Sequence, residues 1–395
     1  MSSASYLIPF SHSNYRMPDT YHDFDTEDSD ICSTASLPIF SPPPSISTSR
    51  TSHDASMRSA SPDPSVRSIT GSLLERVYRH EYGRGFNNYS EVYQLPADRE
   101  ELDRLGTQSE FSMSALQFTI CLTDAQHIMF KEVMGMYAPC MDEIMVDDIP
   151  GEAKTILDLG CGSGSWIMEA ARDYPNCNAV AVDLVPMQSQ YLPPNLRSEV
   201  DDINLGLEHF YGDFNVVHTR LISSGIKDYA GLIHHISLVL RPGGLMDVME
   251  FDFHAYDESY QRIEVGTSRI AGPWWPRWLA FLELAIRNKG GDADAATHLH
   301  RWTTDHDAFE DVVYRDFWVP ASPWRRDSEF SLRMGRGMRD DILAFVQSGR
   351  ALLLGSGVPE DILNELQRNV ESELTTGQGR YYIRLQCIFA RKKRT

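Results

Sequence analysis

The chain contains few cysteines for its length, which makes two classes of protein poor matches. Its 395 residues include six cysteines, at positions 32, 121, 140, 161, 177 and 387. None forms a Cys-x-x-Cys pair, and no Cys/His cluster has the spacing of zinc ligands, so we expect no metal site. A disulfide framework is not expected either, and an intracellular, reducing compartment fits this cysteine content better.

Basic residues are also scarce relative to acidic ones. The chain has 36 Lys and Arg against 56 Asp and Glu, for a formal net charge of -20. Because nucleic-acid binding needs clustered Lys and Arg, this balance argues against a nucleic-acid partner. One basic run, Arg391-Lys392-Lys393-Arg394, lies near the C-terminus. Two interpretations stay open for it, a solvated tail and a nuclear-localisation patch.

Long apolar runs are missing as well. No run reaches the ~18 residues of a membrane helix, and the first ten residues lack the basic start and apolar stretch of a secretion signal. We therefore expect a soluble intracellular protein, cytoplasmic, nuclear or both, with no membrane contact. Residues 1–70 are rich in Ser, Pro and Asp, a composition that buries little apolar surface, and are predicted to be a disordered tail.

The apolar pattern predicts two further regions. Residues 71–150 form a mostly helical N-terminal cap with a loop at 83–89, and residues 151–395 form the main domain. Within 151–251, strands alternate with helices, which implies right-handed crossovers and a parallel sheet. The predicted strands are 154–159, 179–183, 197–200, 214–218 and 245–251, and the helices 165–174 and 228–240.

The region 252–395 is predicted to add a lid and the last strands. Helices are expected at 277–288, 336–354 and 359–374, and strands at 312–319 and 381–390. The two strands, as a late antiparallel hairpin, would complete the sheet. The predicted fold is α/β: a Rossmann-like, seven-stranded, mostly parallel sheet with helices on both faces.

The most informative motif is the turn that ends the first strand. Leu157-Asp158-Leu159-Gly160-Cys161-Gly162-Ser163-Gly164 runs from strand to helix, and glycines there let the backbone approach a nucleotide-like ligand closely. An ordinary tight turn is the alternative. Acids downstream favour a ligand site: Asp183 ends the second strand, where a carboxylate can accept from ribose hydroxyls. Asp201, Asp202 and Ile203 follow the third strand, where they can meet an adenine.

The rival ligand is a nicotinamide or flavin dinucleotide. Its fingerprint, GxGxxG or GxGxxA, requires Gly or Ala where this chain has Ser165, and here the third glycine comes one residue early. Asp158 beside the turn suits a ligand that carries an amine and a sulfonium better than a pyrophosphate. The sequence therefore favours a methyltransferase over a dehydrogenase.

These segments resemble the class I methyltransferases that use S-adenosylmethionine, and within them the fungal LaeA-type group of methyltransferases and regulators. The resemblance covers residues 75–395. The segments that carry it are 82–89, 93–98, 101–105, 126–127, 157–164, 182–188, 193–195, 200–202, 217–220, 226–229 and 240–244.

The resemblance implies roles for particular residues. Asp158, Gly160, Cys161, Gly162 and Gly164 would line the methionine and ribose part of S-adenosylmethionine. The ribose and adenine would meet the residues of the next two strand ends, Asp183, Leu184, Asp201, Asp202 and Ile203. His218 and Arg220 would lie by the reacting methyl group, although His218 can also be a buried strand-end histidine.

The resemblance is interrupted at residues 106–125. In the family pattern the segments matching 103–105 and 126–127 almost adjoin, whereas about twenty residues separate them here. The ends of the insert are compatible with a short intron, so we hypothesise that it is unspliced sequence. A transcript that retains the stretch in the main isoform would contradict this.

The sequence leaves the acceptor and the level of activity open. His218, Tyr89 and His127 are weak candidates for a catalytic base. The segment Pro273 to Trp278 either lines an acceptor pocket or forms core at the start of a helix. The acceptor can be a small molecule or a protein. The alternative function is a cofactor-binding regulatory partner, in complex with other proteins, that has little or no turnover.

Overall fold

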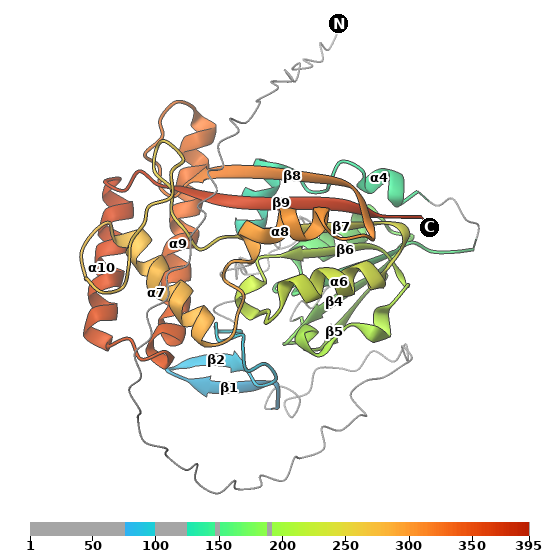
Figure 1. Cartoon of the computed structure of the whole chain (residues 1–395), viewed down its shortest axis with the longest axis horizontal. Helices are drawn as coiled ribbons and strands as arrows, with labels where there is room; N and C mark the ends of the chain where they lie inside the picture. The colour runs from blue at the N-terminus through green and yellow to red at the C-terminus, as the bar shows by residue number, and fades with distance from the viewer. Residues whose placement is uncertain (1–75, 99–124, 147–150, 188–191, 395) are drawn as a thin grey trace, which may run out of the picture. The chain divides into compact units, whose positions relative to one another are not determined.

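A seven-stranded sheet forms the centre of the molecule (Figure 1). The computed structural model describes residues 76–98, 125–146, 151–187 and 192–394. The strand order is β5-β4-β3-β6-β7-β9-β8, parallel from β5 to β7 and antiparallel where β9 joins β7 and β8. The strands are β3 (Thr155–Leu159), β4 (Asn178–Asp183), β5 (Leu196–Val200), β6 (Phe214–Arg220), β7 (Leu240–Phe251), β8 (Phe309–Pro320) and β9 (Tyr382–Lys392). The predicted mostly parallel, seven-stranded fold is confirmed.

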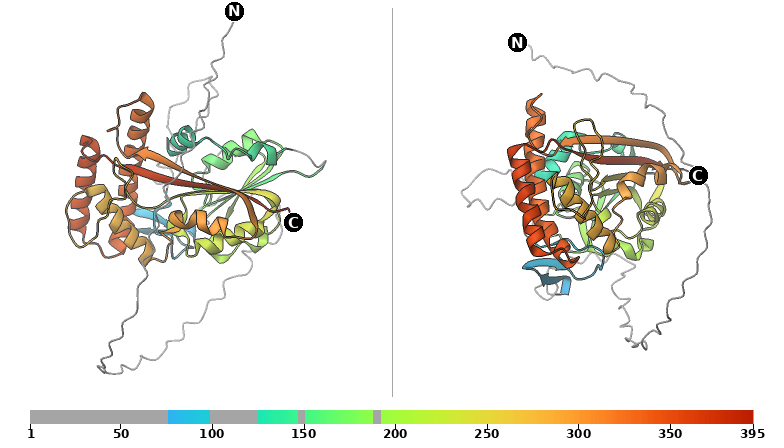
Figure 2. Two further views of the ribbon diagram at one scale, coloured as in Figure 1. Left: turned by 45° about the horizontal axis from the view of Figure 1, so that its top comes forward. Right: turned by 60° about the vertical axis from the view of Figure 1, so that its left-hand side comes forward.

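Alternating side chains of the strands pack against helices on the two faces of the sheet. Leu157 and Leu159 face the layer of α6 (Tyr229–Val239) and α8 (Ala295–Thr304). Ile156, which precedes Leu157 in sequence, faces the layer of α4 (Met141–Ile144) and α5 (Ser165–Asp173). Figure 2 (left) shows the sheet between these layers. Because side chains of a strand alternate with period two, Asp158 lies on the α5 side with Ile156.

Two helices, α6 and α9, begin at a side-chain cap. The Asp228 carboxylate accepts from the Gly231 N–H at 2.8 Å before α6, and Ser328 accepts from the Ser331 N–H at 3.0 Å before α9 (Glu329–Gly355). Such side chains satisfy backbone donors that have no partner within the helix. The predicted helix at 228–240 is confirmed to within a residue.

The N-terminal region differs from the predicted helical cap. Within the described residues of this region, strands β1 (Tyr78–Glu81) and β2 (Arg84–Asn87) form a hairpin, and the longer helices are α3 (Ala125–Met134) and α4. The hairpin turns through Tyr82 and Gly83, both with positive φ, 51° and 76°. Such a turn usually carries Asn or Asp before its Gly. With Tyr at position 82, the sequence gives no signal for the turn. The predicted tail at 1–70 and residues 106–124 of the insert lie outside the described residues. The last residue of the insert, Ala125, begins α3.

The helices of the C-terminal region gather at one end of the sheet. Helices α7 (Trp274–Asn288), α9 and α10 (Glu360–Thr376) pack on one another in both views (Figures 1 and 2). They share a core with Leu221 and Phe253, which follow β6 and β7, so they lie at the carboxyl edge of the parallel strands. The two predicted late strands pair antiparallel as β8 and β9, and the helices predicted between them are α9 and α10. Helix α8 was not predicted.

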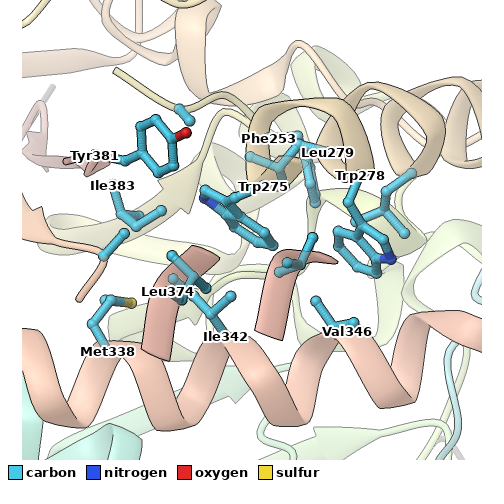
Figure 3. Close-up of a cluster of buried hydrophobic side chains, with 14 of the residues drawn as sticks. Phe253, Trp275, Trp278, Leu279, Met338, Ile342, Val346, Leu374, Tyr381 and Ile383 are labelled. Carbon is cyan, nitrogen blue, oxygen red and sulfur yellow. The ribbon is translucent and has the colours of Figure 1, made fainter. Parts of the chain in front are cut away.

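The tryptophan segment forms part of this core. Trp275 and Trp278 of α7 stack on each other with ring centroids 5.5 Å apart, and both are almost fully buried. Figure 3 shows them facing Ile342 and Val346 of α9. In the described parts of the chain, no helix is long and apolar enough to cross a membrane.

Candidate active site

A cavity of about 220 Å³ lies at the carboxyl edge of the sheet. It is bounded by the residues that follow β3, β4, β5, β6 and β7, which is where open α/β sheets bind ligands. It brings together all but one of the predicted cofactor-binding residues. Those at its wall are Asp158, Gly160, Cys161, Gly162, Asp183, Leu184, Asp201, Asp202, Ile203, His218 and Arg220.

The glycine turn has the backbone that its sequence requires. Gly160, Gly162 and Gly164 all have positive φ, 71°, 55° and 79°, a region that glycine adopts without steric cost. Gly164 departs from the prediction because it does not line the cavity. It caps α5 in the left-handed conformation, and a Cβ there would overlap the side chain of Met187. The close approach of Met187 therefore explains the glycine at this position.

Gly160→Ala should destabilise the fold. A Cβ at Gly160 would overlap the Cγ2 atom of Ile222 in addition to the strain of positive φ. We expect a loss of roughly 2–4 kcal/mol in the free energy of unfolding, measured by urea denaturation. Gly212→Ala is the matched control, since its φ is 76° but no atom lies within 4 Å of the added Cβ. Equal losses in the two variants would show that the contact with Ile222 is unimportant.

The acid before the glycine turn is paired with the histidine of the neighbouring strand. Asp158 and His218 are register partners on β3 and β6, and the Asp158 Oδ1 lies 2.8 Å from the His218 Nδ1. The imidazole stacks on the Trp166 indole with centroids 3.7 Å apart. Since Nδ1 is engaged, Nε2 is the nitrogen with which His218 can meet a ligand. His218 is buried on β6 and also lines the cavity, and its place beside the reacting methyl group stays a prediction.

A second acid continues this row across the sheet. Asp247 on β7 is the register partner of His218. Burial raises the pKa of Asp247, while the nearby His218 and Arg220 side chains lower it in part. Two carboxyl groups thus flank one imidazole on adjacent strands.

Asp183 holds the glycine turn in addition to facing the cavity. Its Oδ2 accepts from the Gly162 N–H at 2.8 Å and its Oδ1 from the Val185 N–H at 3.4 Å. Burial raises the pKa of Asp183, against the lowering effect of these backbone donors. Beyond β5, the Asp202 carboxylate accepts from the Asn204 N–H at 3.0 Å and shapes the turn that carries Ile203.

Two of the three candidate bases lie outside the main cavity. Tyr89 is 36% exposed and lines neither described cavity; Tyr93 lines the main one instead. His127 lines a smaller neighbouring cavity of about 60 Å³. Its Nε2 lies 3.0 Å from a Glu169 oxygen and its Nδ1 3.2 Å from the Arg220 guanidinium, which only donates.

This bonding assigns the His127 proton to Nε2. Burial lowers the pKa of His127, the Arg220 charge lowers it further, and Glu169 opposes both. A neutral imidazole whose two nitrogens are engaged positions Arg220 and is poorly placed to remove a proton. Arg220 also lies over the Phe130 ring, 5.5 Å from its centroid, at the boundary of the two cavities.

Glu250, at the end of β7, is a cavity residue that the sequence reasoning missed. It is 1% exposed, and its Oε1 accepts from the Ile222 N–H, the Ser223 N–H and the Tyr229 hydroxyl at 2.9, 3.2 and 2.8 Å. Burial raises the pKa of Glu250 to about 7, although these donors lower it in part. Its one sequence signal is an acid in an otherwise apolar strand end, Val248-Met249-Glu250-Phe251.

Apolar side chains from α3, α7, α9, β9 and the segment after β7 line the other end of the cavity. They surround a polar pair, Gln126 and Asp341, whose amide and carboxylate lie 3.1 Å apart across 215 residues of sequence. Trp275 belongs to this wall as well as to the core, so both alternatives for the tryptophan segment hold in part. The apolar wall consists of Phe130, Phe253, Trp275, Met338, Ile342, Phe345, Ile383 and Leu385.

Comparison with known proteins gives consistent matches. Residues 127–306 match a family model described as a methyltransferase domain. The chain is 45% identical over 327 residues to the secondary metabolism regulator laeA of Coprinopsis cinerea, covering 82% of this chain and 76% of that protein. It is 25% identical to methyltransferase pytC of Aspergillus terreus, over 74% of this chain and 79% of that one. The cyclopropane synthase MmaA2 of Mycobacterium tuberculosis, a solved structure, is 16% identical with a TM-score of 0.43, covering 77% of this chain and 100% of that one.

Proposed function

Because the chain belongs to the LaeA-type group of class I, S-adenosylmethionine-dependent methyltransferases, we propose that it transfers a methyl group to an acceptor bound in the cavity beyond β3–β7. One observation carries this proposal. The acids of three successive strand ends, Asp158, Asp183 and Asp202, line one cavity together with the glycine turn.

The residues present fit S-adenosylmethionine. The positive-φ turn at Gly160 and Gly162 exposes backbone at the cavity wall, and the buried Asp158 is a carboxylate suited to the ligand's amine. Asp183 and Leu184 would hold the ribose and adenine, and Asp202 and Ile203 the adenine. When bound, the cofactor supplies an electrophilic methyl group on a sulfonium.

The chain's own contribution is then mainly positioning. The two reactants must be held in line, and the buried, apolar far end of the cavity excludes water from an acceptor. Arg220 and His218, at the junction of the polar and apolar ends, are placed to orient the acceptor. His218 Nε2 is the described nitrogen best placed to take a proton if the acceptor must lose one.

A regulatory role without turnover is the second candidate, because the relative from Coprinopsis cinerea is named a regulator. The basic run gives it less support than the sequence suggested. Arg391 and Lys392 belong to β9, and the Lys392 ammonium donates to the Leu240 carbonyl at 2.6 Å. Because they are paired within the sheet, these two residues do not form a free basic tail.

A methyl-transfer assay separates the two candidates. The full chain is incubated with S-adenosylmethionine labelled on the methyl group, and with either a metabolite extract or a nuclear lysate. We expect label in a product of one mixture, and loss of that label with the variant His218→Ala. Tight binding of S-adenosylhomocysteine with no labelled product in either mixture would favour the regulator and contradict the proposed transfer.

A further inference from the structure

The apolar end of the cavity is an interior surface. Phe253, Trp275, Met338, Ile342 and Leu385 are each at most 6% exposed, yet all of them line the cavity. Figure 3 shows Met338 and Ile342 on the face of α9 that points toward Trp275 and Ile383. A group bound here leaves water almost entirely. Apolar surface gains about 25 cal/mol per Å² from such a transfer, whereas an unpaired peptide group would lose free energy.

Among the buried polar atoms without a hydrogen-bond partner in the described residues, one belongs to a residue of the cavity wall. The Nε1 atom of Trp275 is buried and makes no hydrogen bond. In Figure 3 this nitrogen lies on the side of the indole toward Ile383, another residue of the cavity wall. A buried unpaired donor costs about 1–3 kcal/mol, and a ligand oxygen is a group that can remove this cost.

We propose that the methyl acceptor is a small molecule with an apolar body and at least one oxygen, bound with that body between α7, α9 and β9. This inference deepens the proposed methyl transfer and rests on it. The buried apolar wall selects the body, and the Trp275 N–H selects the oxygen.

Equilibrium dialysis with 2-naphthol tests the inference. The probe is neutral at pH 7 and consists of an apolar ring system with one hydroxyl. We expect saturable binding of one molecule per full-length chain. Ile342→Trp, which fills the apolar end, should weaken it at least tenfold, and Met338→Trp provides a second filling variant if the first does not fold. Leu343→Trp is the matched control, because Leu343 is the next residue of α9 and does not line the cavity.

Trp275→Phe tests the role of the oxygen. It should weaken 2-naphthol about fivefold, the value of one neutral hydrogen bond, and leave the affinity for naphthalene unchanged. The inference is overturned if 2-naphthol does not bind, or if Ile342→Trp and Leu343→Trp bind it equally. Label that enters protein and no organic-soluble product in the transfer assay would also overturn it.

Binding of S-adenosylhomocysteine, measured by calorimetry on the same samples, separates the two proposals. Retained cofactor affinity without probe binding rejects only the acceptor inference. Probe binding that Ile342→Trp abolishes, in a chain that binds no S-adenosylhomocysteine, rejects the proposed methyl transfer and leaves a small-molecule site.

Discussion

Asp183→Asn is expected to weaken the binding of S-adenosylhomocysteine by about ten- to a hundredfold, because it removes a charged acceptor from the ligand. Hydrogen bonds to a charged group contribute roughly 1.5–3 kcal/mol each. The structure adds a second reason. Asp183 accepts from Gly162 N–H through one oxygen and from Val185 N–H through the other, and an asparagine has a single acceptor oxygen. The variant should therefore also loosen the glycine turn.

Isothermal titration calorimetry measures this effect, with thermal unfolding as a check on the fold. Asp213→Asn is the matched control, since Asp213 precedes β6 at the opposite, amino edge of the sheet. An unchanged affinity in a folded Asp183→Asn variant would reject the placement of the ribose at β4. Weakened binding in both variants would point to a general effect of charge.

The second large effect concerns Glu250 and pH. In the unfolded chain this carboxyl group loses its proton near pH 4.5, and in the folded protein near pH 7. Between these values the folded state binds more protons, so the free energy of unfolding falls as pH rises through this window. The shift corresponds to a fall of roughly 3 kcal/mol, complete above pH 7.

Glu250→Gln should remove this fall. The amide oxygen can accept from the same three donors and the side chain remains neutral, so the variant should lose roughly 2–3 kcal/mol less stability than the wild type between pH 5 and 8. Urea denaturation at a series of pH values measures the difference. Glu258→Gln, at an exposed residue, controls for the loss of one acid. Parallel pH curves for wild type and Glu250→Gln would contradict the raised pKa.

Local pattern predicted the parallel half of the sheet well and the periphery less well. β3, β4 and β6 are short apolar runs ended by glycine or polar residues, so their type and place follow from the sequence. In α8, apolar residues are interspersed with polar or charged ones, as in His298-Leu299-His300-Arg301. The buried face of α8 is set by its contacts with β8 and β9, which the local sequence does not reveal. The β1–β2 hairpin was concealed by Tyr82 in its turn.

The candidate site likewise has residues that the sequence predicts and contacts that it does not. Asp158 and Asp183 could be found because each lies at or next to the carboxyl end of its strand, and parallel strands end at one edge. The pairing of Asp158 with His218 depends on the register between β3 and β6, which a single sequence does not contain. Gln126 and Asp341 meet across 215 residues. The apolar end of the cavity is formed by such long-range contacts. A single sequence does not reveal them, so the residues that would contact the acceptor could not be predicted.

The position of β9 in the sheet has a consequence for the order in which the protein can fold. Residues 382–392 insert between β7 and β8, which are both made earlier on the ribosome. Until they emerge, β7 presents a free edge of backbone donors and acceptors, a known route to aggregation. A nascent chain that stops before Tyr382 therefore carries the glycine turn and its acids on an unfinished sheet. A chain in which β9 has not yet paired should therefore depend on chaperones more than one with the finished sheet.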